Sequence, residues 1–124
     1  MTTLRQIAES YWKAEGERDL EKILSYYHPD ATFCPPGQIL KGHTEIGTFY
    51  SASGEDFPGL EVVITNDFAV DDQAALEWTA KLTSAAGEEF TIKGINIIKV
   101  RDGKFEWVHA YFDPTVLQSK GAHE

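Results

Sequence analysis

The sequence predicts an α+β fold, in which about three N-terminal helices pack on one face of a curved, mostly antiparallel sheet. Between residues 4 and 51, apolar side chains recur every three or four positions, which is typical of helices. After Leu60 they alternate with polar side chains, as in strands. Two tight-turn sequences, Ala85–Glu88 and Arg101–Lys104, separate consecutive strands. Helices followed by an antiparallel meander indicate two packed layers.

The first helix is expected to begin after Thr3 and to stop at Gly16. Thr3 and Gln6 have the spacing of a capping box, in which each side chain binds the other's backbone N–H. Glycine is a common residue just past the last turn of a helix. The inward face should carry the apolar residues of this segment: Leu4, Ile7, Ala8, Tyr11 and Trp12.

Two further helices are expected before the strands. Asp19 can cap the second, whose inward face should include Tyr27, and the proline of His28–Asp30 should end it. A short extended piece over Ala31–Cys34 and a turn follow. The third helix should run from about His43 to about Ser51, with residues 54–59 forming a loop.

The strands should begin near Val62 and continue over Ala74–Leu82, Phe90–Val100 and Phe105–Asp113. Side chains two residues apart on a strand share a face. The last strand should therefore turn one aromatic row, ending in a carboxylate, toward a single pocket: Phe105, Trp107, His109, Tyr111 and Asp113.

Length and composition indicate one domain over residues 1–124 with a substantial core. The chain of 13.9 kDa is 42% hydrophobic and carries a formal charge of −9, a balance that disfavours nucleic acid and anionic membranes as partners. Cys34 is the one cysteine, which excludes an internal disulfide and fits a reducing compartment. No apolar run reaches the ~20 residues that span a bilayer, so we expect a cytoplasmic protein.

Four short motifs resemble the nuclear transport factor 2-like superfamily, and within it SnoaL-like polyketide cyclases and ketosteroid isomerase-like proteins. They are Arg18-Asp19-Leu20, Pro29-Asp30-Ala31, the segment Gly42–Phe49, and Asp102-Gly103-Lys104. The resemblance covers about residues 4–114 and leaves 115–124 as a C-terminal tail. It implies a cone-shaped, cystatin-like roll, a homodimer formed through the outer sheet face, and no membrane partner.

The resemblance also suggests candidate catalytic residues. Asp113, in Tyr111-Phe112-Asp113, matches the strand-borne aspartate that acts as acid and base in SnoaL-like cyclases. Aromatic neighbours should desolvate its carboxyl and raise its pKa toward neutrality. Tyr11, eight residues before Asp19, matches an oxyanion-hole tyrosine. Each residue has a purely structural alternative: Asp113 as a solvated strand end, Tyr11 as a core tyrosine.

Asn96 and His109 are the other two catalytic candidates. Asn96 interrupts an isoleucine-rich strand, and a buried amide needs partners because an unpaired one costs about 1–3 kcal/mol. It could donate to a carbonyl oxygen, or make a cross-strand structural bond. His109 could contact a ligand, or be a buried histidine bonded to backbone.

The chain departs from two family templates. Pro35 stands where the isomerase base should lie, and a proline cannot abstract a proton. Glu77 and Thr79 occupy the place of the Arg-x-Asp pair that epoxide hydrolases need, so that activity is disfavoured. Cys34 is expected as a small buried hydrophobic residue rather than a nucleophile. No metal-ligand spacing or phosphate-binding glycine loop occurs, so neither a metal nor another cofactor is expected.

The leading hypothesis is a cofactor-independent enzyme of the cyclase, isomerase or dehydratase (lyase) type. Asp113 would shuttle a proton on a hydrophobic, carbonyl-bearing ligand, while Tyr11, Asn96 or His109 would bind the oxygen on which charge develops. The alternative is a ligand-binding or dimerisation module without catalysis. Aromatic residues are expected to form the ligand-binding wall: Trp12, Tyr27, Trp78, Trp107 and Tyr111.

Overall fold

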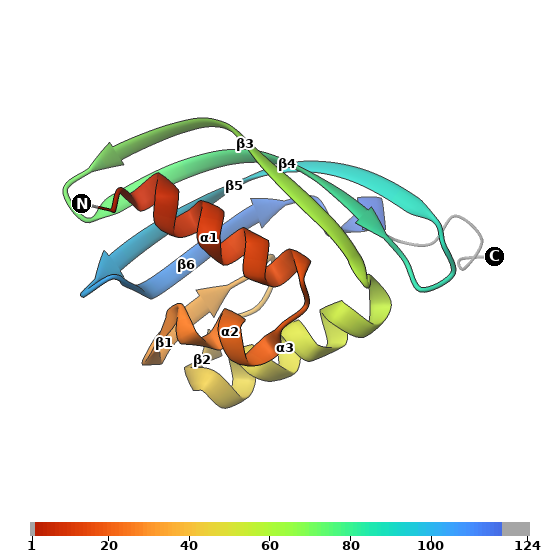
Figure 1. Ribbon diagram of the computed structural model, residues 1–124, viewed down its shortest axis with the longest axis horizontal. Helices are drawn as coiled ribbons and strands as arrows, with labels where there is room; N and C mark the ends of the chain where they lie inside the picture. Colours follow the sequence, from red (N-terminus) through yellow and green to blue (C-terminus); the bar gives the residue numbers. More distant parts are fainter. Residues whose placement is uncertain (1, 118–124) are drawn as a thin grey trace.

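The computed structural model describes residues 2–117. Within this range the helices are α1 (Leu4–Gly16), α2 (Leu20–Ser25) and α3 (Gly42–Asp56), with a short 3-10 helix, η1 (Pro114–Leu117). The strands are β1 (Tyr27–Cys34), β2 (Leu40–Lys41), β3 (Gly59–Val70), β4 (Gln73–Thr83), β5 (Glu89–Arg101) and β6 (Lys104–Phe112). The three α-helices cover one face of the curved sheet (Figure 1). The predicted α+β architecture is confirmed.

The six strands form one sheet in the order β2-β1-β6-β5-β4-β3. Strands β3 to β6 are an antiparallel meander, and the Asp102-Gly103 turn joins β5 to β6 with both residues at positive φ, as a tight hairpin requires. Strand β1 pairs parallel to β6, which joins the helical half of the chain to the meander. No helix within residues 2–117 has the length and apolar character needed to cross a membrane.

Helix α1 forms as predicted. The Thr3 hydroxyl accepts from the backbone N–H of Gln6 at 3.1 Å, and the Thr3 N–H donates to the Gln6 side chain at 2.9 Å. This reciprocal capping box satisfies two N–H groups that the first turn would otherwise leave unpaired. Residues spaced by three or four positions are buried against the sheet: Ile7, Ala8, Tyr11 and Ala14.

The boundaries of the next elements differ from the prediction. Tyr27 begins β1 instead of ending α2, because the neighbouring Tyr26 carbonyl accepts from Phe105 N at 2.7 Å and the segment joins the sheet. Helix α3 continues to Asp56, five residues beyond the predicted end, and leaves the helical region at Phe57, the residue before Pro58. The predicted tail begins with η1, and residues 118–124 of it lie outside the described range. A single domain over 1–124 stays a prediction.

A β-bulge in β6 overturns the predicted facing of the last strand. Trp107 pairs with Lys99 and Phe105 pairs with Val100, so Glu106 is an extra residue on β6. One inserted residue reverses which side chains face the core. Beyond the bulge the core side holds Val108, Ala110 and Phe112, while Trp107, His109 and Tyr111 lie on the outer face. Phe105, before the bulge, is buried as predicted.

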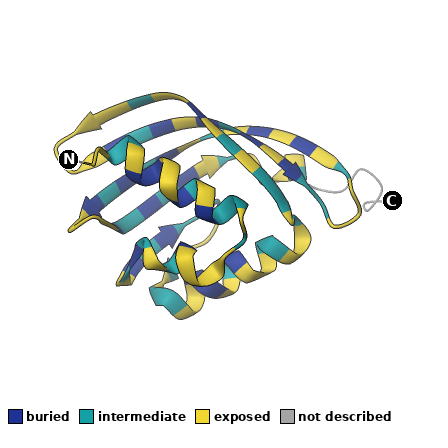
Figure 2. Ribbon diagram, viewed as in Figure 1, coloured by how far each residue is buried: buried dark blue, intermediate teal, exposed yellow. Residues whose placement is uncertain are grey.

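The core lies between the helices and the inner face of the sheet. Figure 2 shows buried residues on the helix sides that face the strands and at alternate positions along β4 and β5. The largest side chains that are less than 2% exposed come from both layers: Ile23, Tyr27, Ile46, Leu76, Ile98, Phe105 and Val108. Burial of this shared apolar surface is the main force that holds the layers together.

Gly94 in β5 provides a stability test. It pairs with Trp78 across the sheet, and a Cβ at this position would lie 2.5 Å from Trp78 Cζ2 and 2.6 Å from the Tyr111 carbonyl oxygen. Gly94→Ala should lower the free energy of unfolding by roughly 1–3 kcal/mol through overpacking. Urea unfolding monitored by tryptophan fluorescence measures the change. Lys93→Ala, at the exposed neighbouring position, is the control, and equal stabilities of the two variants would contradict the argument.

Candidate functional site

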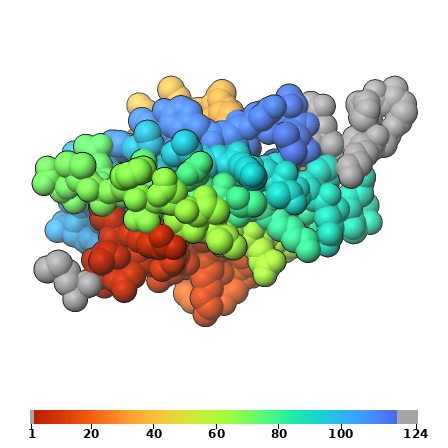
Figure 3. Space-filling model, turned by 90° about the horizontal axis from the view of Figure 1, so that it is seen from above, coloured from red at the N-terminus to blue at the C-terminus, as the bar shows by residue number. Residues whose placement is uncertain are grey.

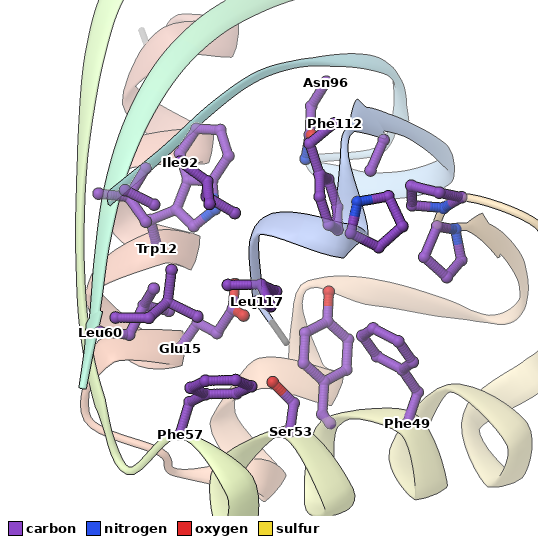
Figure 4. Close-up of a pocket in the computed structure, with 18 of the residues that line it drawn as sticks. Trp12, Glu15, Phe49, Ser53, Phe57, Leu60, Ile92, Asn96, Phe112 and Leu117 are labelled. Atoms are coloured by element: carbon purple, nitrogen blue, oxygen red, sulfur yellow. The ribbon is translucent and has the colours of Figure 1, made fainter. Parts of the chain in front are cut away.

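A pocket of about 320 Å³ lies between α1, α3 and the inner face of the sheet, and we call it the central pocket. Figure 4 shows side chains from these elements pointing into it. Its wall is mostly apolar and aromatic, which suits a small organic ligand. The aromatic residues of the wall are Tyr11, Trp12, Phe33, Phe49, Tyr50, Phe57, Trp78 and Phe112.

A chain of buried hydroxyls ends at a carboxyl in this wall. Tyr27 and Tyr50 share a hydrogen bond of 2.7 Å between their hydroxyl oxygens, Tyr50 and Tyr11 share another, and Tyr11 donates to Glu15 Oε1 at 2.8 Å. Because Tyr11 donates to Glu15, its oxygen is free to accept from Tyr50, and Tyr50 can accept from Tyr27. Such a one-directional chain strengthens each bond in it.

Three elements bring this chain together. Tyr11 and Glu15 are four residues apart on α1 and therefore share its inward face. Tyr50 lies on the buried side of α3, and Tyr27 is the first residue of β1. Tyr11, Glu15 and Tyr50 all line the central pocket, whereas Tyr27 supports them from behind.

Burial governs the protonation of these groups. It raises the pKa of Glu15 above the ordinary glutamate value, against the opposing effects of the Tyr11 hydrogen bond and the nearby Arg18 charge. Burial likewise raises the pKa of the Tyr11 and Tyr50 hydroxyls well above their usual value. The tyrosines therefore remain protonated donors, and Glu15 is the group in this cluster suited to exchange a proton.

Arg18 sits behind Glu15. Its Nη1 lies 3.7 Å from Glu15 Oε2, and its Nη2 donates to the carbonyl of Phe57 at the end of α3. Both side chains of the ion pair are 14% exposed. The guanidinium lines a separate hollow together with Leu20 and Gly54, so it does not face the central pocket.

A second polar group lies on the sheet side of the pocket. Asn96 is 7% exposed, and its Oδ1 accepts from Trp78 Nε1 at 3.0 Å. This is the cross-strand structural bond that the sequence analysis left open. The Asn96 –NH2 group has no hydrogen-bond partner within residues 2–117 and lines the pocket. It remains able to donate to an oxygen of a ligand, so the two interpretations of Asn96 are compatible.

The environment predicted for Asp113 is wrong. The residue is exposed, and its Oδ1 accepts from Thr115 N at 3.0 Å and from Thr115 Oγ1 at 2.6 Å. These hydrogen bonds lower the pKa of Asp113 instead of raising it. The reason is local: β6 ends at Phe112, and the carboxyl caps the turn into η1. Asp113 does not line the central pocket, although Pro114 and Leu117 of η1 do.

The structure also separates three other predicted site residues from the pocket. Trp107 and His109 stack on the outer sheet face with ring centroids 4.5 Å apart, and Tyr111 on the same face is 56% exposed. The β6 bulge is the cause. Cys34 pairs in register with His109 and is half-buried, and burial raises the pKa of its thiol, so the strand arrangement does not activate it.

Four predicted residues do meet at the pocket wall: Tyr11, Trp12, Trp78 and Asn96. The sequence analysis missed Glu15 and Tyr50. The signal for Glu15 was present, because it follows Tyr11 by four residues and is a carboxylate on the apolar face of an amphipathic helix. Tyr50 was expected inside α3, but nothing in its spacing indicated that its hydroxyl would reach Tyr11.

Comparisons with known proteins agree with this architecture. A sequence model of the SnoaL-like domain matches residues 8–108. No curated protein sequence matches the chain. The crystal structure of TerC co-crystallized with polyporic acid is similar, with a TM-score of 0.79, 23% identity, and coverage of 91% of this chain and 93% of TerC.

Two further crystal structures are similar over most of their length. One is a candidate SnoaL-like polyketide cyclase from Shewanella denitrificans OS-217, with a TM-score of 0.80, 18% identity, and 91% and 92% of the two chains covered. The other is a hypothetical protein of ketosteroid isomerase-like fold from Catenulispora acidiphila DSM 44928 in complex with trimethylamine, with a TM-score of 0.80, 14% identity, and 90% and 88% covered. At such identities the likeness concerns the fold.

The raised pKa of Glu15 predicts a pH dependence of stability. The folded protein retains a proton at Glu15 that the unfolded chain has already released, so the free energy of unfolding falls as pH rises through the window from the ordinary glutamate pKa to the raised one. Glu15→Gln removes this dependence. The stability of the variant relative to wild type should therefore increase with pH across that window, whatever constant offset the loss of the Arg18 pair introduces.

Urea unfolding at a series of pH values, from about 4, near the ordinary pKa of glutamate, up to about 8, measures this difference in stability. Glu21→Gln, at an exposed position in α2, serves as the control and should parallel wild type at every pH. If Glu15→Gln also parallels wild type, the carboxyl is not desolvated.

Proposed function

The chain belongs to the SnoaL-like domain family of the nuclear transport factor 2-like superfamily, and from this membership we propose that it is a cofactor-independent enzyme acting on a hydrophobic, carbonyl-bearing small molecule in the central pocket. The reaction is of the cyclase, isomerase or dehydratase type. The observation that supports it most is the Glu15 carboxyl, hydrogen-bonded to Tyr11 in a mostly apolar wall.

In this proposal Glu15 takes a proton from the carbon next to the ligand's carbonyl group. The electron pair of that C–H bond moves toward the carbonyl oxygen, and an enolate forms. The Asn96 –NH2 group donates a hydrogen bond to this oxygen, which favours the charged state over the starting ketone. Where a C=C bond is conjugated with the enolate, Glu15 returns the proton to the far carbon of that bond, which gives isomerisation. In cyclisation the enolate carbon instead attacks a second carbonyl of the ligand, whose C=O π electrons move to its oxygen, and Glu15 gives the proton to the resulting alkoxide.

The acid/base role that the family resemblance implied for Asp113 is assigned here to Glu15. The exchange follows from geometry, because Glu15 lines the pocket and Asp113 caps η1 in solvent. Asn96 keeps the role expected from the sequence, whereas Tyr11 donates to Glu15 and does not bind the oxygen of the ligand. His109 has none in this proposal, since it lies on the outer face. Pro35 lines the pocket and, as a proline, contributes shape without proton chemistry.

The ligands of similar proteins support a small-molecule function. TerC was crystallised with polyporic acid and the Catenulispora protein with trimethylamine, so this fold holds small organic compounds in at least those two chains. A binding module without catalysis is the second candidate. It is favoured by the proline that replaces the expected isomerase base and by the exposure of Asp113.

Deuterium exchange tests the proposed chemistry without knowledge of the product. Aryl ketones and cyclohexenones that raise the melting temperature are incubated with the protein in D2O, and proton NMR follows loss of the signal next to the carbonyl. Wild type should accelerate exchange, and Glu15→Gln should slow it by roughly 10²–10⁴-fold because the base is lost. Ligand binding, measured by thermal shift, should persist in the variant.

Asp113→Asn is the matched control and should exchange at the wild-type rate. Loss of exchange in Asp113→Asn with full exchange in Glu15→Gln would reverse the assignment. Ketones that bind without any exchange in wild type would instead identify a binding module.

We also propose that two copies pair through the outer sheet face in the cytoplasm. Figure 3 views the molecule from above, with β3 to β6 side by side. Five apolar or aromatic side chains on this face are more than 40% exposed: Val63, Phe68, Val70, Ile95 and Tyr111. They come from β3, β5 and β6 of the same sheet, and covering such an apolar area from water favours association. The free Cys34 thiol supports the cytoplasmic location, because it fits a reducing compartment.

The double variant Phe68→Lys with Tyr111→Lys should be monomeric, because two charges on each copy would be buried without partners. Light scattering after size-exclusion chromatography measures the mass, and wild type should elute as a dimer. Glu21→Lys, on the exposed side of α2, is the control and should remain dimeric. A monomeric wild type would contradict the proposal directly.

A further inference from the structure

The charged side chains on the wall of the central pocket are all negative. Within residues 2–117, Glu15 and Asp56 are the acidic residues that line it, and no lysine, arginine or histidine does so. Figure 4 shows the Glu15 carboxyl projecting into the space between the labelled side chains of α1 and α3. Asp56, at the end of α3, is exposed and forms no ion pair in this part of the chain. A ligand in the pocket therefore meets negative charge only.

The aromatic rings around Glu15 also favour a positively charged ligand. Trp12, Phe57 and Glu15 lie at one side of the pocket, and Tyr11 and Tyr50 are in hydrogen-bond contact with the carboxyl or with each other (Figure 4). The face of an aromatic ring carries partial negative charge, so rings and carboxylate together favour a cation.

Arg18 does not supply the positive charge that the pocket side of Glu15 favours. Its Nη1 is 3.7 Å from Glu15 Oε2, beyond hydrogen-bond distance, and its Nε and Nη1 are buried without hydrogen-bond partners. The guanidinium also faces a different hollow, beside Leu20 and Gly54. It partly offsets the Glu15 charge from behind and leaves the pocket side of the carboxyl open.

We propose that the central pocket selects apolar ligands that carry a positively charged nitrogen, a protonated or quaternary amine, and that this nitrogen lies beside Glu15. The inference rests on the proposed function in that it uses the same pocket and the same carboxyl. A cation at this point relieves the cost of keeping Glu15 ionised away from water. The formal charge of −9 over the whole chain attracts such ligands as well.

Asn96, on the opposite side of the pocket, indicates a second chemical group that the preferred ligand should carry. Its amide is 93% buried, the complement of its 7% exposure, and the –NH2 group has no protein partner within the described residues. In Figure 4, Asn96 and Glu15 lie on separate walls with aromatic and aliphatic side chains between them. A donor that no protein group occupies can bind an acceptor on the ligand. The preferred ligand is therefore an apolar amine that also bears a carbonyl or hydroxyl oxygen.

Two probes of the same shape isolate the charge. Benzyltrimethylammonium and neopentylbenzene differ only in having a cationic nitrogen or a neutral carbon at the branch point. Quenching of tryptophan fluorescence reports binding, since Trp12 and Trp78 both line the pocket. Wild type should bind the cation roughly tenfold or more tightly than the neutral probe, from cation–ring and carboxylate contacts together.

Glu15→Gln keeps the size and hydrogen-bonding capacity of the side chain and removes its charge. The variant should lose the preference for the cation while binding the neutral probe as wild type does. Asp56→Asn should reduce the preference less, because Asp56 is exposed to solvent screening. Glu21→Gln, outside the pocket, should change neither affinity.

Proton release gives an independent measurement. Titration calorimetry in two buffers of different ionisation enthalpy should detect protons leaving the wild-type protein when the cation binds below neutral pH, and none when neopentylbenzene binds. The groups that face Glu15 are Tyr11, Tyr50, Tyr27 and Arg18, and burial keeps the three hydroxyls protonated, so Glu15 is the source of the proton. Glu15→Gln should release none.

Each other outcome overturns the inference. Equal wild-type affinity for the two probes, or no binding of the cation, would show that the pocket does not prefer cationic ligands over neutral ones. Equal weakening of both probes in Glu15→Gln would show that the carboxyl only shapes the pocket. These results leave the ketone exchange assay unaffected. Conversely, a clear cation preference without ketone exchange would refute the proposed catalysis and leave the ligand class standing.

Discussion

The meeting of three tyrosine hydroxyls is the constraint on which the arrangement of this protein depends. Tyr11 comes from α1, Tyr50 from α3 and Tyr27 from β1, and all three side chains are buried. An unpaired buried hydroxyl is costly, so the two helices and the strand must hold positions that let all three oxygens meet. The same geometry fixes Glu15 one turn beyond Tyr11 and presents its carboxyl to the pocket.

The β6 bulge determines which side chains of β6 face the core and which lie on the outer face of the sheet. Before it, Phe105 fills the core; beyond it, Ala110 and Phe112 line the pocket while Trp107 and His109 turn outward. Because of this one inserted residue, the small side chain of Ala110 and the ring of Phe112 face the pocket. The rings of Trp107, His109 and Tyr111 lie on the outer face. The strand ends at Phe112, which leaves Asp113 to cap η1 and lets Leu117 line one side of the pocket.

The central pocket combines a mostly apolar wall with two acidic side chains. In the proposed mechanism the group that exchanges the proton is a helix-borne glutamate, whereas the family resemblance pointed to a strand-borne aspartate. Family membership therefore explains the scaffold, and the chemistry of this chain depends on which carboxyl its own packing removes from water. Here that carboxyl is Glu15, with Arg18 behind it and aromatic rings in front.

Local signals in the sequence determined the fold class, the α1 cap, the hairpin turns and four of the pocket residues, because caps, turns and periodicity depend on residues only a few positions apart. They also required a partner for Asn96, which proved to be Trp78. Only the tertiary structure decided the facing of β6, since a bulge depends on how Val100 and Lys99 pair with the neighbouring strand. It likewise decided that Glu15 is desolvated and Asp113 is not, because burial is set by the elements that pack around a side chain and not by its neighbours in sequence.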